Sequence, residues 1–242
     1  MIKNMFLTKI RLSHYFIIVF AVFAVVVSLA HHIKFDSGAL MLFSVNSFLY
    51  GFYISPILGA QKGRIEELHK IVRSEANAIF AMVIGFAKLP KQFRNNLQEM
   101  LLEYLKVSVR QRRSGEGEAK YEAMISYCLD YKGEHQADID KFLDKLVANQ
   151  QNRTNFSMQM SNKVYSNEWM IMIILFTVTL SFILLLDAGE GYLYKILAAL
   201  LCTGLSMLLI ILAKMSTLTH KKAKQIWNPY KKLIDSRFYR ID

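Results

Sequence analysis

The sequence is poor in the residues that interrupt helices or cross-link a chain. It contains 3 prolines and 11 glycines among 242 residues, and its only cysteines are Cys128 and Cys202. So few helix-breaking residues favour long helices over a turn-rich β fold. Cys128 lies in a charged region and Cys202 in an apolar one, so we expect no disulfide framework and a reducing cytoplasm around the middle of the chain. The sequence also lacks the many alternating strands that a membrane barrel requires.

Motifs of enzymes and of metal sites are missing as well. The sequence shows no paired carboxylates beside a histidine, no nucleophile elbow and no phosphate-binding loop. His31 and His32 are adjacent, so on a helix they point to different faces and make a poor metal pair. We therefore expect no enzyme activity, no metal and no cofactor. The net charge of +11 comes without a nucleic-acid-binding motif, so we attribute it to topology and to anionic lipid headgroups rather than to a nucleic-acid partner.

What the sequence does contain is long apolar runs at both ends. Stretches of about 18 or more apolar residues are long enough to cross a bilayer as helices. Three runs of at least this length and one slightly shorter run predict four transmembrane helices, at residues 39–60, 169–186 and 192–213 and at residues 15–29. The first run follows basic residues and could be a signal peptide, but the small-residue cleavage pattern near Ser28 is poor, so we interpret it as a retained helix.

The distribution of charge predicts the orientation of these spans. Residues 60–166 carry 17 Lys/Arg and 13 Asp/Glu, and the tail from Lys214 carries eight Lys/Arg against two acids. Basic residues accumulate on the cytoplasmic side of membrane proteins. We therefore expect an all-α inner (plasma) membrane protein with both termini cytoplasmic: spans one and two in residues 1–60, a cytoplasmic helical domain in 61–166, spans three and four in 167–215, and a basic tail in 216–242.

Apolar residues at helical spacing predict four cytoplasmic helices. The patterns cover residues 76–87, 93–105, 121–129 and 139–147, and the last helix could extend from 138 to 159. Pro90 is expected to open the second helix, where its missing N–H costs little. Residues 110–118 are expected to form a solvated loop. Glu75 is expected near the start of the first helix, either as a partner of the helix dipole or as part of a charged ring around a cytoplasmic vestibule.

Several short motifs along the chain resemble those of the bacterial bestrophin-like membrane proteins. The motifs are Glu75-Ala76-Asn77, Leu89-Pro90, Arg94 with Leu97 and Tyr104, Asn152-Arg153, and Asn228-Pro229-Tyr230. The chain departs from the family pattern at Arg110-Gln111, where members often carry an acidic residue followed by tryptophan. The resemblance implies a fold similar to that of bestrophins, which are homopentameric ion channels with a central pore. It therefore implies a homo-oligomer, most simply a pentamer, with inorganic ions and the lipid bilayer as partners.

Span two carries the most informative pattern. Four small or hydroxyl residues, Ser44, Ser47, Gly51 and Ser55, follow one another at intervals of three or four. They share one helix face, which could line a pore or allow close helix packing. Asn46 should find a hydrogen-bond partner on another helix.

Three aromatic residues of span two lie away from the small-residue face. Phe43, Phe48 and Phe52 could form a hydrophobic constriction or contact lipid and neighbouring helices. No ionisable side chain lies deep within a span, whereas pumps and coupled transporters usually place one there. We therefore expect a passive ion channel lined by span two. The alternative is a non-conducting scaffold or signalling module whose cytoplasmic helices bind a partner.

Overall fold

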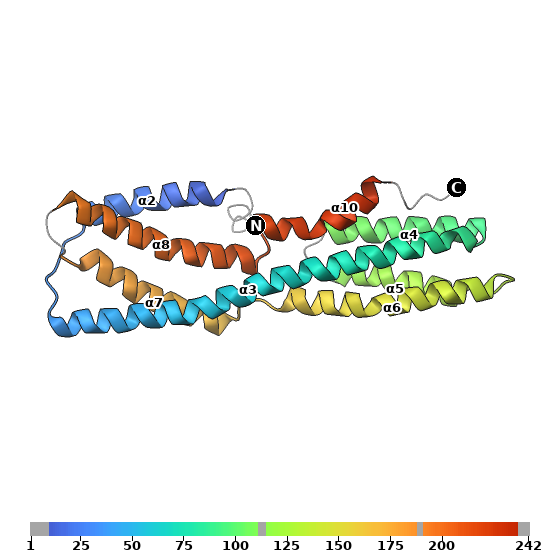
Figure 1. The fold of residues 1–242 in the computed structure, drawn as a ribbon, viewed down its shortest axis with the longest axis horizontal. Coiled ribbons are helices and arrows are strands. Elements are labelled where there is room, and N and C mark those ends of the chain that lie inside the picture. Colours follow the sequence, from blue (N-terminus) through green and yellow to red (C-terminus); the bar gives the residue numbers. More distant parts are fainter. Residues whose placement is uncertain (1–9, 111–114, 188–190, 237–242) are drawn as a thin grey trace. The chain divides into compact units, whose positions relative to one another are not determined.

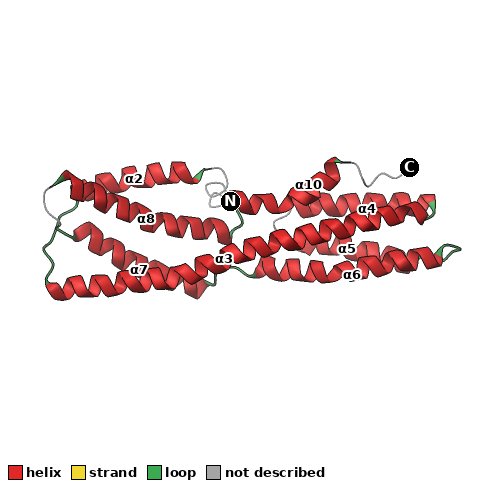
Figure 2. Cartoon of the chain, in the orientation of Figure 1, coloured by secondary structure: helices red, strands yellow, loops and turns green. Residues whose placement is uncertain are grey.

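The computed structural model describes residues 10–110, 115–187 and 191–236, and every element in these ranges is a helix (Figures 1 and 2). The all-α prediction is therefore confirmed. The single β-bridge in the described ranges is an isolated pair, Ile33 with Leu186. The elements are α2 (Leu12–Leu29), α3 (Ser37–Gly85), η1 (Phe86–Lys88), α4 (Lys91–Arg110), α5 (Gly115–Leu129), α6 (Gln136–Ser161), α7 (Ser166–Leu185), α8 (Tyr192–Ser216), α9 (Lys221–Lys224), η2 (Gln225–Trp227) and α10 (Asn228–Asp235).

Four stretches of helix are long and apolar enough to cross a membrane, by length and composition. They coincide with the four predicted runs, which lie in α2, α3, α7 and α8. The chain divides into two compact units. The first unit comprises Met1–Gly63 and Lys163–Ala223, and the second comprises Arg64–Asn162 and Lys224–Asp242.

The first unit has a small core in which α3, α7 and α8 meet. The buried members of this core are Tyr50, Ile54, Val164, Met172 and Leu212. Asn46 adds a polar tie, because its side-chain nitrogen donates to the Leu175 carbonyl at 3.1 Å and to the Thr179 hydroxyl at 2.7 Å. The expectation that Asn46 has an interhelical partner is thus confirmed.

In the same unit α2 lies alongside α8 (Figure 1). Near the end of α8, the side chain of Lys214 is 4 % exposed. Its ammonium group donates to the Ile10 carbonyl at 2.6 Å and lies 4.7 Å from the centre of the Tyr15 ring. Partly buried cation–π contacts of this kind are stabilising. Through this contact and the hydrogen bond, Lys214 stabilises the packing of the end of α8 on the start of α2.

The outer surface of the first unit is apolar. Large hydrophobic side chains are exposed on all four of its long helices, among them Val25, Leu42, Phe48, Ile174 and Leu201. A continuous apolar surface of this extent is rare on soluble proteins and marks a surface that another apolar phase covers. With the length of the helices, it is the property expected of a unit that lies in a bilayer.

The second unit contains α4, α5, α6, α10 and the C-terminal part of α3. Its core is formed by aliphatic side chains at helical spacing, including Leu68, Val72, Ile79, Leu97, Leu101, Leu105, Met124, Ile139 and Leu146. Arg64 caps the C-terminal end of α6, because its guanidinium donates to the carbonyls of Gln159 and Met160 at 2.7 and 3.0 Å. A cation at this end satisfies carbonyls that lack intrahelical partners.

Two sequence expectations about local structure are corrected. No helix begins at Glu75, because α3 runs without a break from Ser37 to Gly85. Apolar residues continue at helical spacing through Ile65, Leu68 and Val72, and no proline lies between them and Glu75. The expected loop at 110–118 is also shorter, since α5 already begins at Gly115. Residues 111–114 of that loop lie outside the described ranges.

The predicted break at Leu89-Pro90 is confirmed. Leu89 has extended backbone angles, φ −91° and ψ 151°, as expected for a residue that precedes proline. Pro90 stands directly before α4, and its carbonyl accepts from the Arg94 amide at 2.8 Å. The proline therefore opens α4 at a position where it has no hydrogen bond to lose.

Candidate functional site

The predicted small-residue face lies on the part of α3 that belongs to the first unit. Ser44, Gly51 and Ser55 are exposed, and Ser47 is half-buried. The core contacts of α3 are made by another flank of the helix, through Tyr50 and Ile54. Ser44, Gly51 and Ser55 therefore lie away from the packed flank, whereas Ser47, three residues before Tyr50, adjoins it.

Backbone geometry shows how open this face is. A Cβ atom built on Gly51 or Gly59 would meet no atom within 4 Å. The hydroxyl of Ser44 is used within its own helix, where it donates to the Leu40 carbonyl at 3.0 Å. The hydroxyl of Ser47 is buried and has no partner among the described residues. The face is therefore open at Gly51 and partly covered at Ser47, and both interpretations of the pattern, pore lining and helix packing, stay predictions.

The three aromatic candidates separate into two groups. Phe48 and Phe52 stack on each other with their ring centres 5.9 Å apart, and they are 68 % and 70 % exposed. Phe43 instead packs on Phe182 of α7, at 5.5 Å between ring centres. A role for Phe48 and Phe52 in a constriction stays a prediction, whereas the contact with α7 accounts for Phe43.

The second unit holds a buried polar cluster, which we call the Glu75 network. Glu75 is fully buried in the middle of α3. Its carboxylate accepts hydrogen bonds from the hydroxyls of Tyr104 on α4 and Tyr230 on α10. Arg153 on α6 lies 3.6 Å from the same carboxylate and is 3 % exposed. Side chains from four helices thus converge on one carboxylate.

Aromatic rings enclose the guanidinium of Arg153. Its central carbon lies 4.9 Å from the centre of the Tyr104 ring and 5.6 Å from that of Phe156. A planar guanidinium stacks well on aromatic faces and keeps its charge when buried. At the edge of the network, Tyr121 donates to the Leu146 carbonyl at 2.8 Å and accepts from Asn149 at 3.1 Å. These contacts extend the cluster from α5 to α6.

The electrostatics of the Glu75 network reflect its burial. Loss of water raises the pKa of Glu75, while Arg153 and the two tyrosine donors act in the opposite direction. Burial acts to lower the pKa of Arg153, but its anionic and phenolic neighbours outweigh this effect and raise it. Burial also raises the pKa values of Tyr104 and Tyr230 well above their ordinary value, so both stay neutral donors.

This arrangement ties four helices together through buried polar contacts. Among the described residues no group of three or more His, Cys, Asp or Glu could hold a metal ion. Glu75 does not sit at a helix end, so its interpretation as a partner of the helix dipole is wrong. A role in a charged vestibule stays a prediction. In the single chain the carboxylate is enclosed and does not face solvent.

The sequence motifs contain the central residues of this network, but they did not predict that these residues are in contact. Glu75, Tyr104, Arg153 and Tyr230 each belong to one of the short motifs that carry the family resemblance, and the structure brings all four together. Periodicity could have added one signal, since each is a polar group placed on the apolar face of its helix. Tyr121 and Asn149 carried no motif and were missed.

Comparison with known proteins agrees with these motifs. A family model described as the bestrophin-like domain matches residues 14–220. No curated protein and no solved structure matches the chain significantly. The matched region contains all four apolar helices, the small-residue face of α3 and three of the four central residues of the Glu75 network. From this match and from the apolar helices, the chain is a membrane protein and belongs to the bestrophin-like family.

Proposed function

We propose that the protein is a homo-oligomeric ion channel in which the small-residue face of α3 lines the path. The observation that supports this is the exposure of Ser44, Gly51 and Ser55 on a helix whose other flank is packed. Water and ions require small or polar groups along their route. A single chain cannot enclose such a route with one helix face, so several copies would have to surround it, most simply five by analogy with bestrophins.

Further features of the proposal follow from charge. No ionisable side chain lies deep in a span, so permeation is passive rather than coupled to protons. The two termini and the second unit lie in the cytoplasm, and the protein resides in the plasma membrane without enzymatic activity. The basic residues of the second unit and the tail would raise the local concentration of anions at that end of the path.

The test is a recording from purified full-length protein in planar bilayers. Gly51→Trp, which places a large ring on the proposed wall, should abolish the conductance. Leu42→Trp is the matched control, because Leu42 is 68 % exposed and lies on another side of the same helix. The reversal potential under a salt gradient would report the sign of the permeant ion.

An electrically silent wild-type protein, across ions and voltages, would contradict the proposal. So would a conductance that both tryptophan variants leave unchanged. A silent protein that still binds a soluble partner through its second unit would favour the alternative, a scaffold or signalling module.

A further inference from the structure

A cleft of about 500 Å³ opens on the second unit between α3 and the C-terminal helices. From α3 it is lined by His69, Arg73, Ala76 and Asn77, and from η2 and α10 by Gln225, Asn228, Pro229 and Lys232. This size falls in the range of small-molecule sites. We call it the basic cleft, because its lining contains positively charged and amide side chains and no carboxylate.

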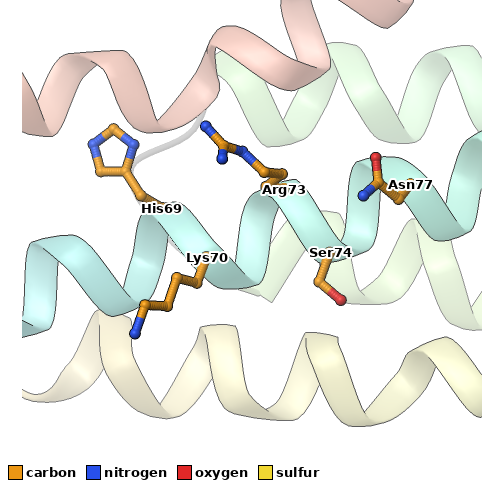
Figure 3. A pocket seen from close by; sticks show the side chains of 5 residues that line it. All are labelled: His69, Lys70, Arg73, Ser74 and Asn77. Carbon is orange, nitrogen blue, oxygen red and sulfur yellow. The ribbon is translucent and has the colours of Figure 1, made fainter.

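The arrangement of side chains on α3 defines one wall. His69, Arg73 and Asn77 follow one another at intervals of four, and they point to the same side of the helix (Figure 3). Lys70 and Ser74 point to the other side of α3 (Figure 3). A neighbouring depression of about 380 Å³ is lined by all five of these residues. A guanidinium and an amide one turn apart on one face can donate to the same polyatomic anion.

The opposite wall of the basic cleft is formed by η2 and α10, and it adds a second positive charge. Asn228 and Pro229 begin α10, and Lys232 is exposed one turn further along. Directly after Pro229 comes Tyr230, which is fully buried and bound to Glu75. The Glu75 network therefore holds α10 against α3, so the two helices that carry the donors are in place before a ligand arrives. Preorganisation of this kind lowers the entropic cost of binding.

We propose that the basic cleft is a binding site for a phosphate-bearing anion. Arg73 and Lys232 supply the charge, and Asn77, Asn228 and Gln225 supply neutral donors. A single halide ion would leave most of the cleft and most of these donors unused, whereas the two or three non-bridging oxygens of a phosphate group can accept from both walls. The phosphate group comes from a soluble phosphate ester or from an anionic lipid headgroup, and the residues that would bind it are not those proposed to line the ion path.

The experiment uses the full chain in nanodiscs of phosphatidylcholine, titrated with sodium pyrophosphate at constant ionic strength and followed by calorimetry. Saturable binding is expected. The variant Arg73→Gln with Lys232→Gln should weaken it at least about tenfold, because each charge-assisted hydrogen bond contributes that order of affinity. Lys91→Gln with Lys141→Gln removes the same charge from exposed positions outside the cleft and should leave the affinity unchanged. Arg73→Lys should retain part of it.

A second arm identifies the source of the phosphate. Nanodiscs that contain phosphatidylglycerol are prepared with wild-type protein and with both double variants, and the lipid retained by each protein is measured by mass spectrometry. Selective retention of phosphatidylglycerol that only the cleft variant loses would support the site with a lipid as its ligand. Binding in neither arm, or equal loss in the cleft variant and the Lys91/Lys141 control, would overturn the proposal. All substituted side chains are exposed, and circular dichroism verifies that each variant folds.

Discussion

At the scale of single residues, the buried pair of Glu75 and Arg153 is the feature whose disturbance has the largest expected effect. A buried ion pair often contributes little net stability, because both charges lose their hydration. Removing one partner is different, since the remaining charge is left without compensation. In this protein two tyrosine hydroxyls also donate to the carboxylate. Removing either charge alone therefore disturbs contacts between side chains of four helices.

We therefore expect Arg153→Met to lower the free energy of unfolding by about 3–5 kcal/mol. The loss would be measured by denaturant titration of the detergent-solubilised protein, followed by circular dichroism. The double variant Glu75→Gln with Arg153→Met should lose less than the sum of the two single changes, because no buried charge is left unpaired.

The surface pair Lys120–Glu103 provides the matched control for this experiment. Its atoms are 2.8 Å apart, but the two side chains are 44 % and 55 % exposed. Exposed ion pairs contribute up to about 1 kcal/mol, so Lys120→Met should stay within that limit. Equal losses for Arg153→Met and Lys120→Met would show that the Glu75 network does not stabilise the fold.

The tyrosines of the network make stability depend on alkaline pH. Burial raises the pKa values of Tyr104 and Tyr230 well above 10.0 in the folded protein, whereas the unfolded chain ionises near the ordinary value. The folded state therefore keeps its protons where the unfolded state releases them. Their contribution is complete below about pH 10 and is lost as pH rises beyond it, at about 1.4 kcal/mol per pH unit for each tyrosine.

Tyr230→Phe should accordingly flatten the fall of the unfolding free energy above pH 10 by about 1.4 kcal/mol per pH unit relative to the wild type. The same denaturant titrations, repeated between pH 8 and pH 11.5, give the slope. Tyr192→Phe, at an 86 % exposed position, serves as the comparison. Identical slopes for the wild type and Tyr230→Phe would contradict the assignment.

At the scale of the element, α3 carries two different surfaces on its N-terminal part. Tyr50 and Ile54 enter the core of the first unit, while Ser55 and Gly51 remain exposed. Pro56 lies inside the helix, and without an N–H it leaves one carbonyl of the preceding turn without its usual partner. Such a carbonyl adds a polar group to the serine hydroxyls of this region of α3.

If the small-residue face meets water, a cysteine placed there should react with a water-soluble thiol reagent. Ser55→Cys is expected to react quickly in proteoliposomes, and Ile54→Cys, which is buried, slowly. Leu42→Cys tests the lipid-facing alternative, since it is exposed but should be surrounded by hydrocarbon. The two native cysteines are buried, so the background should be low. Equal reactivity at positions 42 and 55 would contradict a water-filled path along this face.

At the scale of the whole molecule, hydrophobic periodicity accounts for most of what the sequence could predict. The four apolar helices and the break at Pro90 follow from composition and from the properties of proline, which act locally. The continuation of α3 through Glu75 was not predicted, because a buried carboxylate in the middle of a helix is tolerated only when its partners are present. Those partners, Tyr104 and Tyr230, lie on other helices, and local patterns do not identify them.

The candidate sites show the same division. The residues of the small-residue face were predictable, because they occur within a few turns of one helix. The basic cleft was not, since Arg73 and Lys232 are far apart in the sequence and come together only when α10 packs in the second unit. The tail was expected to be basic, with Pro229 and Tyr230 packing on the cytoplasmic helices, and its helix α10 indeed supplies the fully buried Tyr230 to the second unit.

The position of Tyr230 has a consequence for how the protein is made. Glu75 and Tyr230 are separated by 155 residues, and both apolar helices α7 and α8 are synthesised between them. While the ribosome is still producing these helices, the carboxylate of Glu75 lacks one of its two hydroxyl donors. The second unit is therefore completed only after α7, α8 and α10 have been synthesised, and a chain that terminates before Tyr230 would display an unfinished interior that cellular proteases can recognise.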